Sequence, residues 1–258
     1  MNFKEYLTWY RDVVDKEVEG WFYPIDIIVM YGILNDIQKE ISGDVCEVGV
    51  AYGKSAITIS NFKKTNDNFY LYDIFPEEVY AKCLSNIKKF GTDNNLIWRI
   101  EDTTQLNHKD GKLFENPIRF LHIDGCHEHS AVLGDLQFFS QYMLDQGVIV
   151  LDDFNDYEYP GVNSAAVEFS LAKYNVKNWR VFAIGDNKAY LCQKRFLPTY
   201  QSMLAMFMKS ALKNMNVPFP LPLGLREMMD VNVLMCDSRE DWDLNKIVQC
   251  VFDKPRIG

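Results

Sequence analysis

The stretch Glu47–Ser55 (EVGVAYGKS) constrains the fold most, because it joins a short apolar segment to a predicted helix through a turn with two glycines. Gly49 and Gly53 let the backbone approach a ligand closely. A helix that begins near Lys54 would direct free backbone N–H groups and its positive dipole end at that ligand. The spacing matches neither a P-loop nor a dinucleotide fingerprint, whose middle glycine is replaced here by Ala51. We therefore expect a cofactor-binding turn of another class.

Short apolar segments alternate with helical patterns along the chain, which predicts a parallel sheet flanked by helices. The predicted strands are 44–48, 69–73, 96–100, 119–123 and 147–151. Two further segments, 179–183 and 189–193, are joined by Gly185, Asp186 and Asn187, a composition typical of an antiparallel hairpin.

Helical periodicity also marks both ends of the chain. We expect an N-terminal helix over 3–17, a second helix after Pro24 and a Met-rich helix near 199–214. The aromatic cluster Trp21, Phe22 and Tyr23 is a candidate cover for a binding site. In the tail, the three prolines of PFPLPLG exclude regular structure there.

Composition and charge narrow the class of partner. With 258 residues, 48% of them hydrophobic, the chain can form one large domain plus an appendage. A net charge of −9 disfavours nucleic acid and anionic membranes as obligate partners. No segment approaches the roughly 18 consecutive apolar residues of a membrane helix, and charged residues interrupt any signal-peptide core near the N-terminus. We expect a cytoplasmic protein with a small-molecule partner.

The six cysteines form no C-x-x-C pair and no zinc-like cluster with the four histidines, so neither a disulfide framework nor a zinc site is expected. Cys46 and Cys192 lie in apolar strands and are predicted to be buried. Cys126, within IDGCHEH, has two interpretations: a nucleophile, or a residue that packs or lines a pocket.

Three carboxylates follow two of the predicted strands. Asp124 ends the strand 119–123, and Asp152 and Asp153 end the strand 147–151. Ligands of open α/β sheets bind at the carboxyl ends of the strands, and neighbouring carboxylates attract a hard divalent cation such as Mg²⁺. Acids at these positions also cap helices or bind the amino acid part of a cofactor, and this alternative stays open.

His127 stands three residues after Asp124 and suits a general base, because its ordinary pKa lies near neutral pH. It could instead cap the following helix. We expect His129 to point outward, His108 to lie in a polar loop and His122 to be a strand residue, and we assign no chemistry to these three.

The order of these motifs resembles that of class I S-adenosylmethionine-dependent methyltransferases. The turn after 44–48 is similar to their first motif, and FYLYD places Asp73 about 20 residues later, where such folds bind a ribose. The blocks RFLHIDGCHEH, GVIVLDDFND and YPGV resemble the metal-dependent sugar and natural-product O-methyltransferases, which include macrolide sugar-methylating enzymes. The resemblance covers roughly 40–195.

The resemblance implies an α/β fold: a doubly wound, mostly parallel, seven-stranded Rossmann-like sheet. N-terminal helices (1–40) would precede the catalytic domain (41–195), and an accessory, lid or oligomerisation segment (196–258) would follow it. Methyl transfer from S-adenosylmethionine to a hydroxyl of a sugar or small natural product is implied, in a protein that is expected to be a homo-oligomer.

The resemblance also assigns roles to single residues. Asp124, Asp152 and Asp153 would hold Mg²⁺ or another divalent metal, and His127 would act as the base. The predicted cofactor-binding residues are Glu47, Gly49, Val50, Ala51, Gly53, Ser55, Asp73, Asp102, Thr103 and Asp124. Among these, Asp73 is assigned to the ribose, and Asp102 and Thr103 to the adenine, although this pair also suits a helix cap.

Three alternatives remain open at this point. The acceptor atom could be nitrogen or carbon. A nucleotide-binding oxidoreductase could share the architecture, although the broken glycine pattern disfavours it. A non-catalytic binding protein could use 196–258 as an interaction surface.

Overall fold

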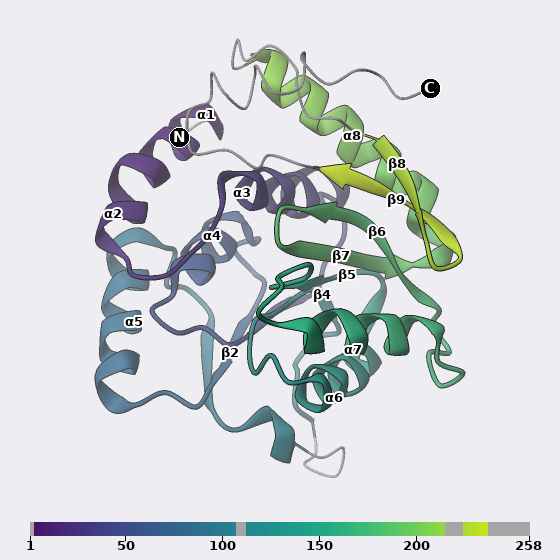
Figure 1. Ribbon diagram of the computed structural model, residues 1–258. Coiled ribbons are helices and arrows are strands. Elements are labelled where there is room, and N and C mark those ends of the chain that lie inside the picture. Colours follow the sequence, from purple (N-terminus) through teal and green to yellow (C-terminus); the bar gives the residue numbers. More distant parts are fainter. Residues whose placement is uncertain (1–2, 107–111, 215–223, 237–258) are drawn as a thin grey trace.

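A nine-stranded sheet forms the centre of the molecule (Figure 1). The computed structural model describes residues 3–106, 112–214 and 224–236. The strand order is β3-β2-β1-β4-β5-β7-β6-β9-β8. The strands are β1 Asp44–Val48, β2 Phe69–Asp73, β3 Leu96–Ile100, β4 Ile118–Ile123, β5 Met143–Leu151, β6 Trp179–Gly185, β7 Lys188–Gln193, β8 Gly224–Met228 and β9 Val231–Cys236.

The first seven strands confirm the predicted doubly wound sheet. Neighbours among β1 to β5 pair in parallel, and β7 lies antiparallel between β5 and β6. The hairpin predicted around Gly185 joins β6 to β7. The sheet is larger than predicted, because β9 pairs in parallel with β6 and β8 pairs antiparallel with β9.

Helices cover both faces of the sheet (Figure 1). One face is covered by α6 His129–Phe139 and α7 Pro160–Leu171, and the other by α3 Pro24–Tyr31, α4 Lys54–Phe62 and α8 Leu197–Asn214, with α5 Glu77–Phe90 beside α4. Alternate strand residues point to opposite layers: Val45 and Phe120 belong to one buried cluster, and Cys46 and Leu121 to the other. Hydrophobic residues thus fill the space on both sides of every central strand.

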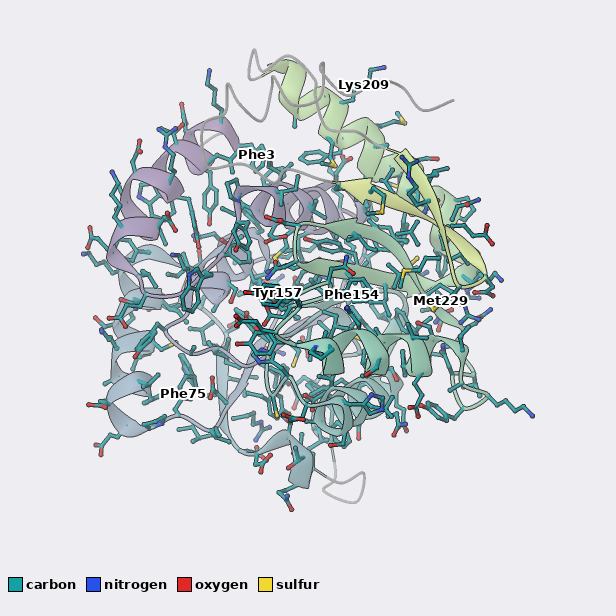
Figure 2. All side chains as sticks on the ribbon, viewed as in Figure 1. Phe3, Phe75, Phe154, Tyr157, Lys209 and Met229 are labelled. Atoms are coloured by element: carbon teal, nitrogen blue, oxygen red, sulfur yellow. The ribbon has the colours of Figure 1, made fainter. Side chains whose placement is uncertain are left out.

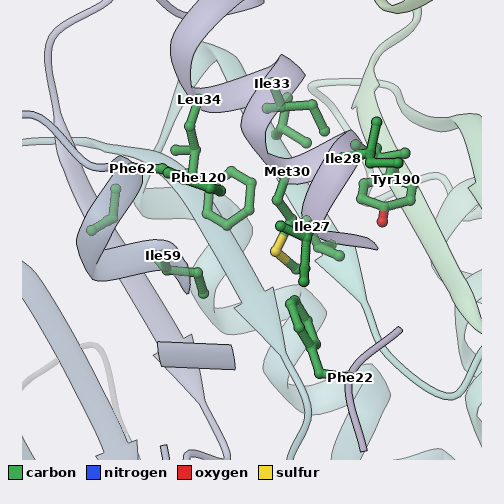
Figure 3. Close-up of a cluster of buried hydrophobic side chains, with 14 of the residues drawn as sticks. Phe22, Ile27, Ile28, Met30, Ile33, Leu34, Ile59, Phe62, Phe120 and Tyr190 are labelled. Atoms are coloured by element: carbon green, nitrogen blue, oxygen red, sulfur yellow. The ribbon is translucent and has the colours of Figure 1, made fainter. Parts of the chain in front are cut away.

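The N-terminal segment is helical as predicted, but it contains two wider turns. The helix α1 Phe3–Trp9 continues through a π-helical turn, Tyr10–Val14, into α2 Asp15–Glu17. A second π-helical turn, Gly32–Ile37, extends α3. Figure 3 shows how the apolar side chains of this extended helix meet those of α4, β4 and β7. The segment is therefore part of the main hydrophobic core.

The apolar face of helix α8 packs against other elements of the same chain. Leu204 and Met208 are fully buried, and the ring of Phe207 lies so close to Gly32 that a Cβ atom there would come within 2.5 Å of it. We expected this helix to cover the substrate side or a second subunit. Its buried face instead contacts the extension of α3 and β6, while Met206 is 72% exposed. The side chain of Leu212 and the stretch 218–223 lie outside the described residues.

Among the described residues, no helix has the length and apolarity that a membrane span requires.

Candidate active site

The glycine turn between β1 and α4 brings two strand ends together. Gly49 has a φ of 80°, and a Cβ atom on it would lie 1.9 Å from the carbonyl oxygen of Asp124. Gly53 has a φ of 86° and precedes the first residue of α4. Only glycine fits where the backbone is left-handed and the neighbouring chain is this close. The turn therefore begins directly beside the loop that follows β4, and it ends against α5.

Asp73, at the end of β2, holds this turn in shape. Its Oδ2 accepts hydrogen bonds from the backbone N–H groups of Val50 at 2.7 Å and Ala51 at 2.8 Å. Ala51 has a positive φ of 45°, which is costly for a residue other than glycine. The two bonds offset that strain and use one oxygen of the carboxylate. Asp73 thus lies where the ribose role was predicted, and it also supports the loop.

His122, the next-to-last residue of β4, links two of the predicted site acids. Its Nδ1 lies 2.7 Å from Glu47 Oε1, its Nε2 lies 3.3 Å from Asp152 Oδ2, and its side chain is fully buried. Burial alone would lower the pKa of His122, but the carboxylates of Asp152 and Glu47 raise it to about 10. The signal that sequence reasoning passed over was an ionisable residue in an apolar strand, where a buried charge needs partners.

The pair with His122 also bears on the predicted cofactor contact of Glu47. Its side chain is fully buried against His122, and Glu47 Oε2 has no hydrogen-bond partner among the described residues. His122 thus occupies only Oε1 of this carboxylate. The contact of Glu47 with the methionine part of the cofactor stays a prediction, and it would have to use Oε2 if the pair with His122 is kept.

Lys188, the first residue of β7, was also missed from the sequence. Its Nζ lies 2.6 Å from Asp152 Oδ1 and 3.3 Å from Asp26 Oδ2, and it stands over the ring of Phe22 at 5.2 Å. The side chain is 1% exposed. Burial raises the pKa of Asp26 to about 7 in spite of this lysine. A lysine that begins the apolar strand KAYLCQ was the available signal.

The carboxylates of Asp124 and Asp153 meet His127 at the carboxyl edge of β4 and β5. His127 Nε2 lies 2.9 Å from Asp153 Oδ2 and 3.9 Å from Asp124 Oδ1, and its ring packs against that of Tyr159, tilted by 33° with 4.0 Å between centroids. Asp153 has a φ of 53°, a strained backbone for an aspartate. The prediction that these residues are neighbours agrees with the pairing of β4 and β5.

Two groups of side chains offer ligand atoms that all lie within 4.8 Å of one another. One is His122, Asp124 and Asp152, and the other is Asp124, His127 and Asp153. Desolvation and the charge of Asp152 raise the pKa of Asp124 to about 7. Asp152 behaves differently, because Lys188 and His122 hold its pKa well below the usual range. Asp124 thus has the imidazole of His127 only at 3.9 Å, whereas Asp152 has the ammonium of Lys188 at 2.6 Å.

The residues assigned to the adenine lie at the end of β3. Asp102 caps the turn Thr103–Gln105 by accepting hydrogen bonds from the N–H of Thr104 at 2.9 Å and its hydroxyl at 2.7 Å. The predicted cap is confirmed. A cavity of about 240 Å³ opens beside it, lined by Thr103, Thr104, Leu106, Ser130, Ala131, Gly134, Gln137 and Phe138.

Of the other residues singled out in the sequence, those that the structure describes take no part in these contacts. Ser55 is buried in the first turn of α4, and Cys126 is exposed in the loop after β4. His129 points outward as expected and contacts Ser164 and Glu168. His108 lies outside the described residues.

Exposed aromatic side chains stand near the same edge. Trp21 and Tyr157 are each 88% exposed, and Tyr23 is 41% exposed. Tyr157 belongs to the loop between β5 and α7, where Figure 2 labels it beside Phe154. A larger cavity, of about 540 Å³, lies at the opposite ends of β4 and β5, where Asn116 and Met143 line it. The carboxyl edge of β4 and β5, where the acids lie, is therefore separate from this larger cavity.

Comparison with known proteins agrees with this architecture. Residues 46–154 match the sequence profile of a family described as a methyltransferase domain. An uncharacterized protein of Acanthamoeba polyphaga mimivirus, R132, is 27% identical over 114 residues, which are 42% of this chain and 47% of that protein. The matched part thus spans about half the length of this curated relative.

Solved methyltransferases share the fold at low sequence identity. An O-methyltransferase from Bacillus cereus, solved in complex with SAH, has a TM-score of 0.53 and 13% identity over 73% of this chain and 88% of its own. CalS11, a calicheamicin methyltransferase, has a TM-score of 0.52 and 12% identity over 74% of this chain and 91% of its own. The domain match and the shared fold confirm the predicted resemblance to class I S-adenosylmethionine-dependent methyltransferases: residues 46–154 match a methyltransferase domain, and the chain has the fold of solved O-methyltransferases.

Proposed function

We propose that this chain transfers a methyl group from S-adenosylmethionine to a hydroxyl group of a small-molecule acceptor, a sugar or another natural product, with the help of a divalent cation. One observation carries the proposal: Asp124, Asp153 and His127 meet at the carboxyl edge of the sheet, beside the glycine turn. A base and a cation site next to a cofactor loop are what hydroxyl methylation requires.

The cofactor is proposed to lie across the ends of β1, β2 and β3. The turn from Gly49 to Gly53 would hold its amino acid part, Asp73 its ribose, and the cavity lined by Thr103 and Thr104 its adenine. The sulfonium group of the cofactor supplies an electrophilic methyl group, so the protein mainly has to align the acceptor and exclude water.

The proposed cation ligands are Asp124, Asp152 and Asp153, an all-oxygen set that suits Mg²⁺. Asp124 belongs to both groups of neighbouring ligand atoms, Asp152 to the group with His122 and Asp153 to the group with His127. Asp152 would contribute through Oδ2, since its Oδ1 already accepts from Lys188 at 2.6 Å. When bound, the cation would supply Lewis acidity that lowers the pKa of the acceptor hydroxyl.

His127 is the proposed base. The carboxylates of Asp124 and Asp153 raise its pKa to about 10, so in the protein without a cation the imidazole is protonated. A cation bound to the same two carboxylates would offset their negative charge and so lower the pKa of His127 again. His127 could then accept the hydroxyl proton, while the tilted ring of Tyr159 packs against the imidazole and helps to hold it in place.

The acceptor class rests on two further supports. CalS11, which shares the fold, is a methyltransferase of calicheamicin. The exposed Trp21 and Tyr157 offer aromatic faces on which a sugar or a flat natural product could stack.

Two measurements test the proposal. Calorimetry should show binding of S-adenosylmethionine and S-adenosylhomocysteine and no binding of a nicotinamide dinucleotide. Transfer of a labelled methyl group to a panel of sugars and phenols should stop in EDTA and return with Mg²⁺. Binding of a nicotinamide dinucleotide without the methyl donor would contradict the function, and full turnover in EDTA would remove the cation from it.

A further inference from the structure

Asn187 and Lys188 contact both acids that end β5. They lie where the β6–β7 turn meets β7, opposite Asp152 and Asp153. Lys188 Nζ donates to Asp152 Oδ1 at 2.6 Å, and Asn187 Nδ2 donates to Asp153 Oδ1 at 3.1 Å. Each acid is therefore held through one oxygen by one residue of the pair.

A third contact joins the two holders. Lys188 Nζ also donates to Asn187 Oδ1 at 3.1 Å. Because that oxygen faces the ammonium, the amide nitrogen of Asn187 has to face Asp153. The orientation of Asn187 is thus set by Lys188, and the two residues are expected to act as a unit.

The second oxygen of each carboxylate, which neither Asn187 nor Lys188 contacts, is directed at the candidate site. Asp153 Oδ2 lies 2.9 Å from His127 Nε2, and Asp152 Oδ2 points to the group that includes His122 and Asp124. Asp153 also has a strained backbone, with a φ of 53°, so its side-chain direction depends on outside support. Without the amide of Asn187, the carboxylate could rotate away from His127.

We propose that Asn187 and Lys188 are a positioning pair: they fix the two acids so that each presents a single oxygen toward the cation and toward His127. This inference rests on the proposed function. It assigns to the β6–β7 turn a role in the chemistry, in addition to its place in the sheet. Groups that orient the ligands of a metal typically change affinity or activity by about 10- to 100-fold when they are removed.

Asn187→Ala is the first test, with Mn²⁺ as the probe of the cation site. Binding of Mn²⁺, measured by electron paramagnetic resonance, should weaken by about tenfold or more, and kcat should fall by a similar factor. The KM for S-adenosylmethionine should stay within about twofold, because the pair does not contact the proposed cofactor residues.

Asn175→Ala is the matched control. Asn175 also holds a hairpin end by its amide, since it donates to Trp179 O at 3.1 Å at the start of β6, far from the acids. We expect it to lower the melting temperature while Mn²⁺ affinity and kcat stay unchanged. A structural role of Asn187 would give the same pattern as this control.

A double-mutant cycle with Lys188→Met tests whether the two residues act as a unit. If Lys188 orients Asn187, the double variant should lose little more kcat than Lys188→Met alone. Additive losses, or wild-type Mn²⁺ affinity in Asn187→Ala, would overturn the pair while leaving the proposed function intact. If the wild-type protein transfers methyl groups without binding Mn²⁺, both the positioning role of the pair and the role of the cation are wrong. If it neither transfers methyl groups nor binds Mn²⁺, the proposed function is wrong as well.

Discussion

At the scale of single residues, Asp73 combines support of the cofactor turn with a predicted contact to the cofactor. In Asp73→Ala, the N–H groups of Val50 and Ala51 lose their acceptor, and the ribose loses its predicted one. A hydrogen bond to a charged group contributes about 1.5 to 3 kcal/mol, so the Kd for S-adenosylhomocysteine should rise at least tenfold. Calorimetry measures this, with circular dichroism to check that the fold survives. An unchanged Kd would show that Asp73 does not bind the ribose.

His127 and Asp153 are predicted to fail in different ways. His127→Ala should leave Mn²⁺ and cofactor bound but slow methyl transfer by about a hundred- to ten-thousandfold, with partial recovery at higher pH. Asp153→Asn and Asp124→Asn should weaken Mn²⁺ binding instead, because a neutral amide replaces an anionic ligand. Single-turnover rates and metal titrations separate the two. Near-wild-type turnover by His127→Ala would make this histidine structural.

The buried His122 predicts a pH dependence of stability. Its pKa is raised from 6.5 to about 10, so the folded protein binds this proton more tightly than the unfolded chain does. The resulting stabilisation is complete below pH 6.5 and is lost as the pH rises through about 10. The melting temperature should therefore fall over this range by several degrees more in the wild type than in His122→Gln. Parallel melting curves for the two proteins would contradict the charged histidine.

At the scale of elements, α8 is predicted to stabilise the fold without taking part in cofactor binding. Leu204→Ala removes a fully buried side chain and should cost about 2 to 5 kcal/mol. Met206→Ala, on the exposed side of the same helix, is the control and should be nearly neutral. Thermal denaturation compares them, and the Kd for S-adenosylhomocysteine should be unchanged in both. A loss of cofactor binding in Leu204→Ala alone would show that α8 shapes the site.

The elements also show which parts of the fold a sequence can encode locally. The strands 44–48, 69–73 and 96–100 have the bounds of β1, β2 and β3, because short apolar runs between helical patterns carry their own signal. The strands β8 and β9 were missed. The strand β9 pairs with β6 across 51 positions of sequence, as from Ala183 to Leu234 (234 − 183), and no local pattern reports such a contact. The hairpin that joins β8 to β9 is itself local.

The candidate site divides in the same way. Asp124, Asp152, Asp153 and His127 follow strand ends, so topology alone brings them together. The buried partners His122, Lys188 and Asp26 come from inside β4, β7 and α3, and only the packed structure shows that their charges face Asp152 or one another. Such buried charged residues belong to no sequence motif, because only the packing of the chain brings their partners close to them.

At the scale of the whole molecule, the expected homo-oligomer remains a prediction. The apolar face of α8 is already used within the chain, which removes the surface first suggested for it. Exposed apolar residues remain along α7 and beyond it: Val167, Leu171, Tyr174 and Val176. Light scattering at several concentrations measures the state, and Leu171→Lys should shift a dimer toward monomer if this surface is the contact. A monomer at all concentrations would contradict the prediction.

The added hairpin also changes how the sheet ends. In a seven-stranded sheet, β6 would present its backbone N–H and C=O groups at an open edge, but here β9 covers it and β8 becomes the outermost strand. Free edges invite pairing with other chains, and charged side chains discourage it. The centre of β8 carries Arg226 and Glu227, both exposed, whereas β6 is almost entirely buried and apolar. The hairpin thus gives this border of the sheet a charged strand in place of an apolar one, which by the general rule for free edges disfavours self-association through it.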